Sequence, residues 1–117
     1  MNAPGAGLEV NCAIADGVAR IGLIGELDIT GTDPLREALE SAFDRGAARI
    51  LIDLSQTSFI DSAGIALLLH CERDAHAADR PLRVVAPAGS EARLFVKLAG
   101  LGRILDLAEP QDPWPTA

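Results

Sequence analysis

The chain has 117 residues, 49% of them hydrophobic, and its 17 acidic and 10 basic residues give a formal net charge of -7. This length fits one domain with a single core, and the hydrophobic content excludes disorder along the whole chain. The acidic balance, with no basic stripe interleaved with aromatic residues, argues against binding to nucleic acid.

The start of the chain and its cysteines add further limits. Residues 1–7 lack the positive and apolar regions of a signal peptide, and no apolar run approaches the roughly 18 residues of a membrane span. We therefore expect a cytoplasmic protein with no membrane contact and a flexible N-terminus over residues 1–7. Cys12 and Cys71 lie in no CxxC or Cys/His ligand spacing, so they predict free thiols and neither a disulfide framework nor a zinc site.

The first predicted element is a two-stranded hairpin. Residues 8–13 alternate between apolar and polar side chains, which is the period of a half-buried strand. Asp16-Gly17 supplies a turn, and an apolar, β-branched run covers residues 18–24. Residues 25–32, rich in glycine and in side-chain oxygens, are expected to form a loop.

A helix is predicted from Asp33-Pro34 to Gly46. Asp33 can accept hydrogen bonds from the free N–H groups of the first turn, and Pro34 at the first helical position lacks a donor that would have no partner. Apolar residues recur at i, i+3, i+4, i+7 and i+8 from Leu35, so one face of this helix is apolar. Residues 49–54 follow as a strand that is apolar on both faces and therefore flanked by other elements.

The second half of the chain predicts two more helices with a strand between them. The second helix runs from about residue 63 to about residue 77, and residues 82–86 form a strand. Ser90 is expected to cap a third helix and Gly100 to end it. The apolar side of this third helix consists of Leu94, Phe95, Leu98 and Leu101.

The order of these elements predicts the fold class. Residues 104–107 form a last short strand or a turn, and residues 109–117 are expected to be a loose, proline-rich tail. The order β-β-α-β-α-β-α over residues 8–108 predicts an α/β domain with a mixed sheet. An N-terminal hairpin precedes later strands that are parallel, and the sheet packs against about three to four helices.

Partner and ligand surfaces in such sheets lie beyond the carboxyl ends of the parallel strands. This rule selects the loop 25–32 and the junction 58–64, where Ser62 stands at the start of the second helix. As an N-cap, Ser62 would bond its hydroxyl to free N–H groups of the first turn, while Ala63 and Gly64 leave that hydroxyl accessible. Ser62 is therefore either a simple helix cap or a reactive group.

The residues around Ser62 do not predict catalysis. A hydrolase serine needs a histidine within hydrogen-bond reach, and His70 would lie about 12 Å along the helix at 1.5 Å per residue. Asp53 is interpreted as a loop-capping acid, and Asp53 with Asp61 makes a weak metal site. The chain also lacks a phosphate-binding loop and a kinase signature. We expect no catalytic residue, no cofactor and no metal, so phosphoryl transfer to Ser62 would need a second protein.

Three segments resemble a known family. The stretch Phe59-Ile60-Asp61-Ser62-Ala63-Gly64-Ile65, within residues 51–68, resembles the signature of the anti-sigma factor antagonists, which are bacterial proteins built from a single STAS domain. Gly25-Glu26-Leu27-Asp28 resembles the second motif of that family, and residues 92–101 resemble its third-helix segment. The resemblance extends from about Leu8 to Leu107 and implies a STAS-type fold.

The resemblance implies a partner-switching protein without catalysis of its own. In this family the unphosphorylated antagonist binds an anti-sigma factor that is also a serine kinase, and a sigma factor is released. The kinase phosphorylates the serine after the signature aspartate, and a serine phosphatase reverses the reaction. By position the phosphoacceptor is Ser62. The implied partner-binding residues are Asp28, Thr30, Ser58, Asp61, Ala63, Gly64 and Ile65.

Ala63 stands where the family often has Ser or Thr, which leaves one acceptor hydroxyl at the signature.

Two other functions stay open on the sequence. One alternative is a STAS scaffold subunit of a transporter or signalling complex without a phosphorylation cycle. The other is a small hydrolase that uses Ser62, which the missing base disfavours. The oligomeric state is open between a monomer and a weak dimer.

Overall fold

A computed structural model describes residues 7–114. The predicted flexible N-terminus therefore lies outside the described residues, apart from Gly7, as do residues 115–117 of the tail. The strands are β1 (Leu8–Ala15), β2 (Val18–Leu27), β3 (Arg49–Asp53), β4 (Thr57–Ile60), β5 (Leu82–Val85) and β6 (Asp106–Ala108). The helices are α1 (Thr32–Asp44), α2 (Ser62–Ala77) and α3 (Glu91–Leu98), and two 3-10 turns are η1 (Ile29–Gly31) and η2 (Leu101–Arg103).

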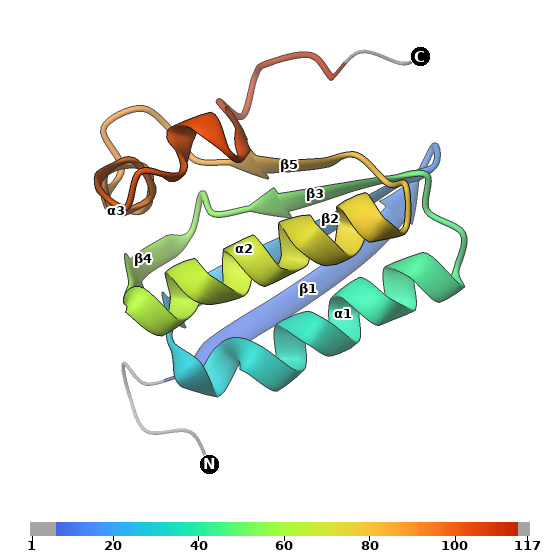
Figure 1. Cartoon of the computed structure of the whole chain (residues 1–117), viewed down its shortest axis with the longest axis horizontal. Coiled ribbons are helices and arrows are strands. Elements are labelled where there is room, and N and C mark those ends of the chain that lie inside the picture. The colour runs from blue at the N-terminus through green and yellow to red at the C-terminus, as the bar shows by residue number, and fades with distance from the viewer. Residues whose placement is uncertain (1–6, 115–117) are drawn as a thin grey trace.

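The strands form one six-stranded mixed sheet (Figure 1). β1 and β2 make the antiparallel hairpin, in register from Leu8 opposite Gly25 to Ala15 opposite Val18. β2, β3, β5 and β6 then follow as parallel neighbours. The predicted fold class, an N-terminal hairpin followed by parallel strands with α-helices packed on the sheet, is confirmed.

β2 is longer than predicted, because it has two partners in succession. Residues 18–22 pair with β3, and residues 25–27 pair with β4, with a register shift between Gly25 and Glu26 inside the second pairing. The prediction that all of residues 25–32 form a loop is therefore wrong for residues 25–27. The Thr57 hydroxyl donates to the Leu23 carbonyl at 2.7 Å, which ties the start of β4 to β2.

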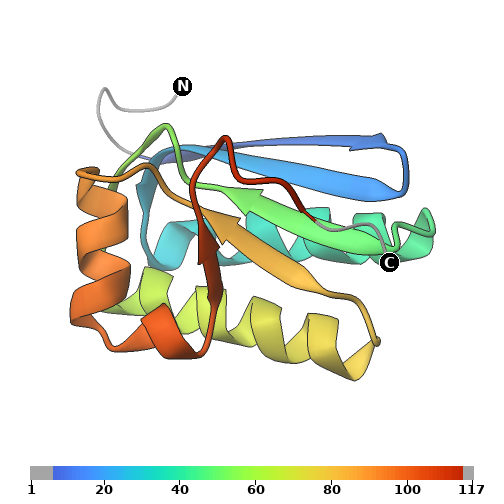
Figure 2. The same cartoon turned by 90° about the horizontal axis from the view of Figure 1, so that it is seen from above.

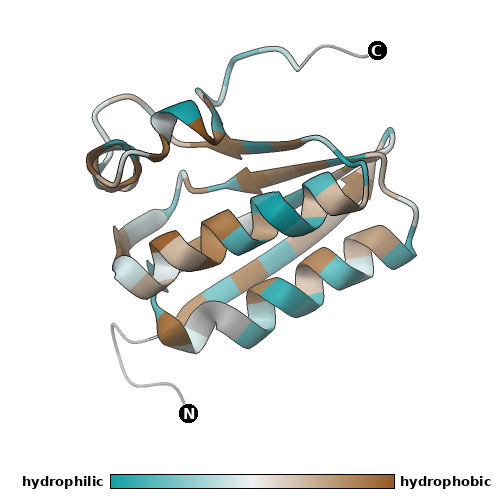
Figure 3. Cartoon of the chain, in the orientation of Figure 1, coloured by the Kyte–Doolittle hydropathy of each residue, from teal (hydrophilic) through white to brown (hydrophobic). Residues whose placement is uncertain are grey.

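The sheet and the helices form two layers (Figures 1 and 2). α1 and α2 lie along one face of the sheet, and α3 lies near the end at which the parallel strands finish. Figure 3 shows apolar residues concentrated along β3 and β5 and recurring along both long helices. The large side chains buried between the layers include Ile21, Leu23, Leu35, Ile50, Ile52, Leu68 and Val84. Within residues 7–114, no helix combines the length and apolar character that crossing a membrane requires.

The predicted apolar side of the third helix is confirmed only in part: Leu101 is buried and Phe95 packs against the core, but Leu94 and Leu98 do not. Ser90 caps it as expected, since its hydroxyl accepts a hydrogen bond from the Arg93 N–H at 3.2 Å. The buried residues of α3 are Ala92 and Val96, whereas Leu94 and Leu98 are 53% and 73% exposed. Small side chains against the sheet bring the helix close to it, and the larger leucines are left on the outside.

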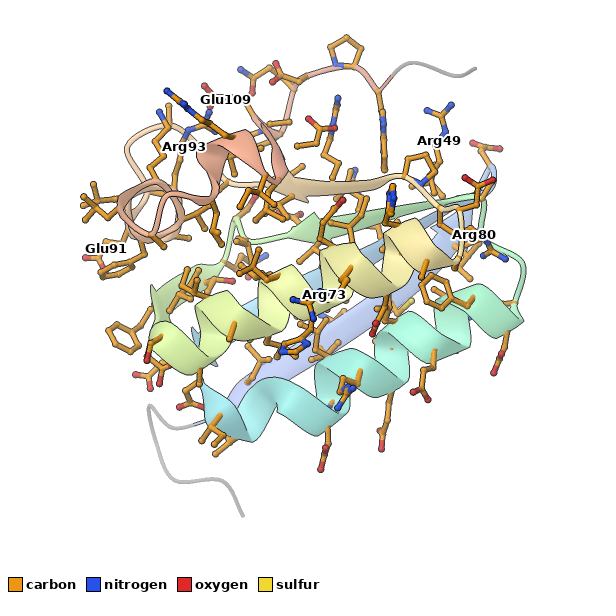
Figure 4. The ribbon with its side chains drawn as sticks, in the orientation of Figure 1. Arg49, Arg73, Arg80, Glu91, Arg93 and Glu109 are labelled. Carbon is orange, nitrogen blue, oxygen red and sulfur yellow. The ribbon has the colours of Figure 1, made fainter. Side chains whose placement is uncertain are left out.

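The Arg93 guanidinium fixes α3 to the ends of two strands. It donates to the carbonyl of Ala86, after β5, at 2.7 Å and to the carbonyl of Ala108, in β6, at 3.4 Å. Beside it, the Glu109 carboxylate accepts from the Ala88 N–H at 2.8 Å (Figure 4). The outward position of the two leucines is therefore held by hydrogen bonds at the base of the helix.

The described part of the tail crosses the face of the sheet opposite to α1 and α2 (Figure 2). The Arg83 guanidinium pairs with Asp106 at 2.9 Å and donates to the Pro113 carbonyl at 3.1 Å. Arg83 and Arg49 also lie over the Trp114 ring, at 5.2 Å and 5.5 Å from its centroid. These cation–π contacts place Trp114 against the open face.

Gly64 allows α2 to lie against the end of β2. A Cβ atom at this position would stand 2.9 Å from Cγ2 of Ile60 and closer still to the carbonyl oxygen of Leu27. The backbone oxygen cannot move without disturbing the pairing of β2 with β4. Residue 64 must therefore lack a side chain if the helix is to keep this position.

We predict that Gly64→Ala lowers the free energy of unfolding by about 1–3 kcal/mol, because the added methyl overpacks a rigid contact. Gly102→Ala is the control, since a Cβ there would meet only Cγ of Lys97 at 4.0 Å. Its effect should stay within about 0.5 kcal/mol. Urea unfolding of both variants measures the difference, and equal stabilities would contradict this account of Gly64.

Candidate functional site

The candidate site lies where β2 and β4 end together. These two strands are parallel, and their last residues, Leu27 and Ile60, are paired. Asp28 and Asp61 come directly after them, and the Asp61 N–H donates to the Leu27 carbonyl at 3.2 Å. Ser62 follows as the first residue of α2. The topology thus brings two segments more than thirty residues apart to one edge of the sheet.

Asp61, and not Ser62, caps α2. The Asp61 backbone is extended, with φ -96° and ψ -174°, and its carboxylate Oδ1 accepts from the Gly64 N–H at 2.9 Å. The prediction that the Ser62 hydroxyl serves as the N-cap is therefore wrong. Aspartate is as good a cap as serine, and its carboxylate also interacts favourably with the helix dipole.

The Ser62 side chain is consequently free. Ser62 is exposed, and its hydroxyl has no hydrogen-bond partner among the residues that the structure describes. Its neighbour Ala63 has only a methyl group. An incoming group can therefore reach the Ser62 oxygen without breaking a contact within the domain.

Asp28 is fixed by Thr30 in the adjacent turn. Its Oδ1 atom accepts from the Thr30 N–H at 2.9 Å and also from the Thr30 hydroxyl. The side-chain hydrogen bond from Thr30, followed by the backbone one, lowers the pKa of Asp28 below its ordinary value. Asp28 is thus a negative charge at neutral pH, on the turn that leads into η1.

The other predicted partner-binding residues divide between surface and interior. Ser58 is exposed, and its hydroxyl donates to the Gly25 carbonyl at 3.2 Å. Ala63 is half-buried, and Ile65 is half-buried against the core. Gly64 is buried beneath the others. Gly64 can therefore influence a partner only through the position of α2.

The apolar rim of the site was not predicted from the sequence. It consists of Ile29, Phe59, Leu94 and Leu98, which are 73%, 42%, 53% and 73% exposed. The Phe59 ring meets the Phe95 ring edge to face at 5.7 Å between centroids, which connects β4 with α3. A signal for two of these residues was present in the sequence: Leu94 and Leu98 are spaced i, i+4 on a face opposite to Ala92 and Val96.

The described residues offer Ser62 no catalytic base. His70 lies two helical turns further along α2. Cys71 is buried, and its desolvation, with a further contribution from Asp74, raises the pKa of the thiol to about 12 against a smaller opposing effect of Arg36. Among residues 7–114, no group of three or more His, Cys, Asp or Glu side chains is arranged to hold a metal ion.

A family model matches most of the chain. Residues 10–107 match the family described as Mlab, STAS domain. This match covers every strand and helix from β2 to α3 and most of β1 and β6.

Solved structures with a similar fold include several anti-sigma factor antagonists. One from Mycobacterium paratuberculosis has a TM-score of 0.77 and 24% identity, over 96% of this chain and 93% of that chain. SpoIIAA in its unphosphorylated form has a TM-score of 0.67 and 24% identity, over 90% of each chain. The phosphorylated form of Bacillus SpoIIAA has a TM-score of 0.63 and 24% identity, over 90% of this chain and 94% of that chain.

We predict that Asp61→Ala lowers the free energy of unfolding by about 1 kcal/mol, because α2 loses its cap. Asp61→Asn is the matched control, since its amide oxygen can still accept from the Gly64 N–H while the charge is removed. In denaturant unfolding, the free energy of unfolding of Asp61→Asn should be close to that of the wild type, and that of Asp61→Ala should be clearly lower. Equal losses in both variants would mean that the carboxylate acts through its charge and not as a cap.

Proposed function

This chain belongs to the STAS domain family, and from that premise we propose that it is an anti-sigma factor antagonist regulated by phosphorylation of Ser62. In this proposal the unphosphorylated protein binds an anti-sigma factor with serine kinase activity, and a sigma factor is released. The kinase then moves the γ-phosphoryl group of its ATP to Ser62 Oγ, which yields ADP and a proton. The phosphorylated protein dissociates, and a serine phosphatase removes the phosphate.

The observation that carries the proposal is the free hydroxyl of Ser62 at the exposed start of a helix that another residue caps. A kinase needs an acceptor oxygen that can enter its own active site. Ser62 meets this need, because its hydroxyl is exposed and is not required by the fold. Phosphorylation would therefore leave the Asp61 cap and the close approach of Gly64 unchanged.

Electrostatics explains why the same change would release a partner. A phosphate adds about -1.5 to -2 charges near pH 7. The N–H groups at the start of α2 favour it within the domain. At an interface it would lie beside the Asp61 carboxylate and near the turn that carries Asp28, where added negative charge is costly unless the partner pairs with it. A cost of about 2.7 kcal/mol is already a hundredfold in affinity.

The apolar rim supports a protein partner. Large exposed apolar side chains are typical of an interaction surface, and four of them lie on η1, β4 and α3, at the same end of the sheet as Ser62 (Figure 1). Ile29, Phe59, Leu94 and Leu98 would bury their side chains on docking, while Ser62 and Asp61 supply the polar part of the contact. The phosphorylated form of SpoIIAA, which is similar in fold, is consistent with a STAS domain that keeps its structure when it carries a phosphate.

We predict that incubation with a cognate anti-sigma factor kinase and ATP phosphorylates the chain at Ser62 alone. Ser62→Ala should fold, bind the kinase and remain unmodified. Ser62→Asp should weaken binding by at least about tenfold, or about 1.4 kcal/mol. Mass spectrometry of proteolytic fragments locates the phosphate, and calorimetry measures the affinities.

The exposed Ser58 is an internal control in the same experiment, because it lies at the same edge of the sheet. A phosphate on Ser58 instead of Ser62 would contradict the assignment of the acceptor, and a phosphate on both serines would contradict the prediction that Ser62 is the sole acceptor. Binding without any phosphorylation would instead favour a STAS scaffold subunit that has no phosphorylation cycle.

We also predict that Leu94→Ser and Leu98→Ser each weaken binding to that kinase by roughly tenfold, because exposed apolar side chains are lost from the contact. Both side chains are more than half exposed, so the unfolding temperature should change less than on replacing a buried residue. Val96→Ser is the contrasting variant, since Val96 is fully buried and its replacement should destabilise the fold. Unchanged affinity in both leucine variants would remove α3 from the docking surface.

A further inference from the structure

A cleft of about 230 Å³ opens between α1 and α2. Its lining consists of Arg36 from α1 and Ala63, Ala66, Leu67 and His70 from α2. The small alanine side chains leave the groove open beside the first turns of α2. The side-chain groups that can interact with a polar ligand there are the Arg36 guanidinium and the His70 imidazole, and both are basic.

The Arg36 guanidinium is unpaired. It is exposed and forms no hydrogen bond or ion pair with any residue from 7 to 114. Other arginines have partners: Arg20 pairs with Asp53 at 3.3 Å, and Arg83 pairs with Asp106 at 2.9 Å. The Arg36 charge nevertheless lies near enough to α2 to act on the Cys71 thiol. A free cation therefore faces the second helix.

Ser62 is the neighbour, along α2, of residues that line this cleft. It directly precedes Ala63 and lies one helical turn before Ala66, so it borders the strip of α2 that lines the groove. Acidic groups lie on the segments next to Ser62 at the ends of β2 and β4 and at the start of α1: Glu26, Asp28, Asp33 and Asp61. α3, at the same end of the sheet, carries the basic residues Arg93 and Lys97.

We propose that the cleft between α1 and α2 is an intramolecular receptor for a phosphate monoester on Ser62, with Arg36 as the cation that pairs with it. This inference rests on the phosphorylation of Ser62 proposed above. A guanidinium matches phosphate oxygens with two parallel N–H donors, and the free N–H groups at the start of α2 add further donors. The pairing offsets the repulsion from the neighbouring Asp61 carboxylate.

The pairing would have a consequence for partner binding. Phosphate held toward α1 lies over the groove and across the first turns of α2. The same reaction that adds charge at Ser62 therefore also neutralises Arg36 and covers the floor formed by Ala63 and Ala66. Arg36 acts here as a positioning residue, because it holds the phosphate and takes no part in its transfer.

The test uses the full chain with phosphoserine incorporated at position 62 during translation, so no kinase is needed. The second pKa of the phosphate is measured by ³¹P NMR in the wild-type background and in Arg36→Gln. A nearby cation favours the dianion and lowers this pKa. We expect Arg36→Gln to raise it by about 0.5 unit or more.

Arg45→Gln is the matched control, because it removes the same charge from an exposed arginine beyond the other end of α1. It should shift the phosphate pKa by less than about 0.1 unit. Arg36→Lys, which keeps the charge without the paired donors, should restore part of the effect. In the phosphorylated wild type, the Arg36 Nε–H signal should also move downfield relative to the unmodified protein.

Equal phosphate pKa values in Arg36→Gln and Arg45→Gln, with an unmoved Arg36 Nε–H signal, would overturn the proposal. Circular dichroism establishes that both variants are folded before the titration. The result is independent of the kinase experiment, because the phosphate is installed without an enzyme. If the titration shows no effect of Arg36, Ser62 can still be a kinase acceptor. If the kinase experiment fails, the phosphate pKa values still show whether Arg36 pairs with the phosphate.

Discussion

The close approach of α2 to the end of β2 is the contact on which the candidate site depends. Gly64 leaves room for the Leu27 carbonyl and the Ile60 side chain. The Leu27 carbonyl also accepts a hydrogen bond from the Asp61 N–H at 3.2 Å. The pairing of β2 with β4, the start of α2 and its cap therefore all depend on the absence of a side chain at Gly64. Because Ser62 is the first residue of α2, this contact fixes its backbone position while its hydroxyl stays exposed and unpaired within the described residues.

Because Asp61 and not Ser62 caps α2, the proposed modification of Ser62 would leave the stability of the helix start unchanged. A serine that capped its own helix would lose the capping hydrogen bond when modified, at a cost of about 1 kcal/mol. Here the cap belongs to Asp61, so the hydroxyl is free for another role. The Asp61 carboxylate that stabilises the helix also gives Ser62 a negative environment. A phosphate added at Ser62 would therefore increase the electrostatic cost of binding a partner there.

Sequence patterns were sufficient for the fold class and for the position of Ser62, because both follow from local periodicity and from the order of elements. These patterns failed where contacts between distant segments of the chain decide the local structure. Residues 25–27 contain glycine and acid and predict a loop, yet β4 supplies a second hydrogen-bonding partner and keeps them in β2. The buried face of α3 was predicted only in part. Phe95 packs against the core as expected, but the larger Leu94 and Leu98 are exposed and the smaller Ala92 and Val96 fit against the sheet.

The same distinction applies to the site. Asp61 and Ser62 are equally good caps in isolation, and only the position at which α2 meets β2 decides between them. The apolar rim joins residues from η1, β4 and α3, and the cleft joins Arg36 with α2, so neither is visible in a single segment. What the chain order encodes locally is a serine at the start of a helix. The groups that would give the proposed modification of this serine a consequence come from elsewhere in the fold, and a serine signature alone does not establish a switch.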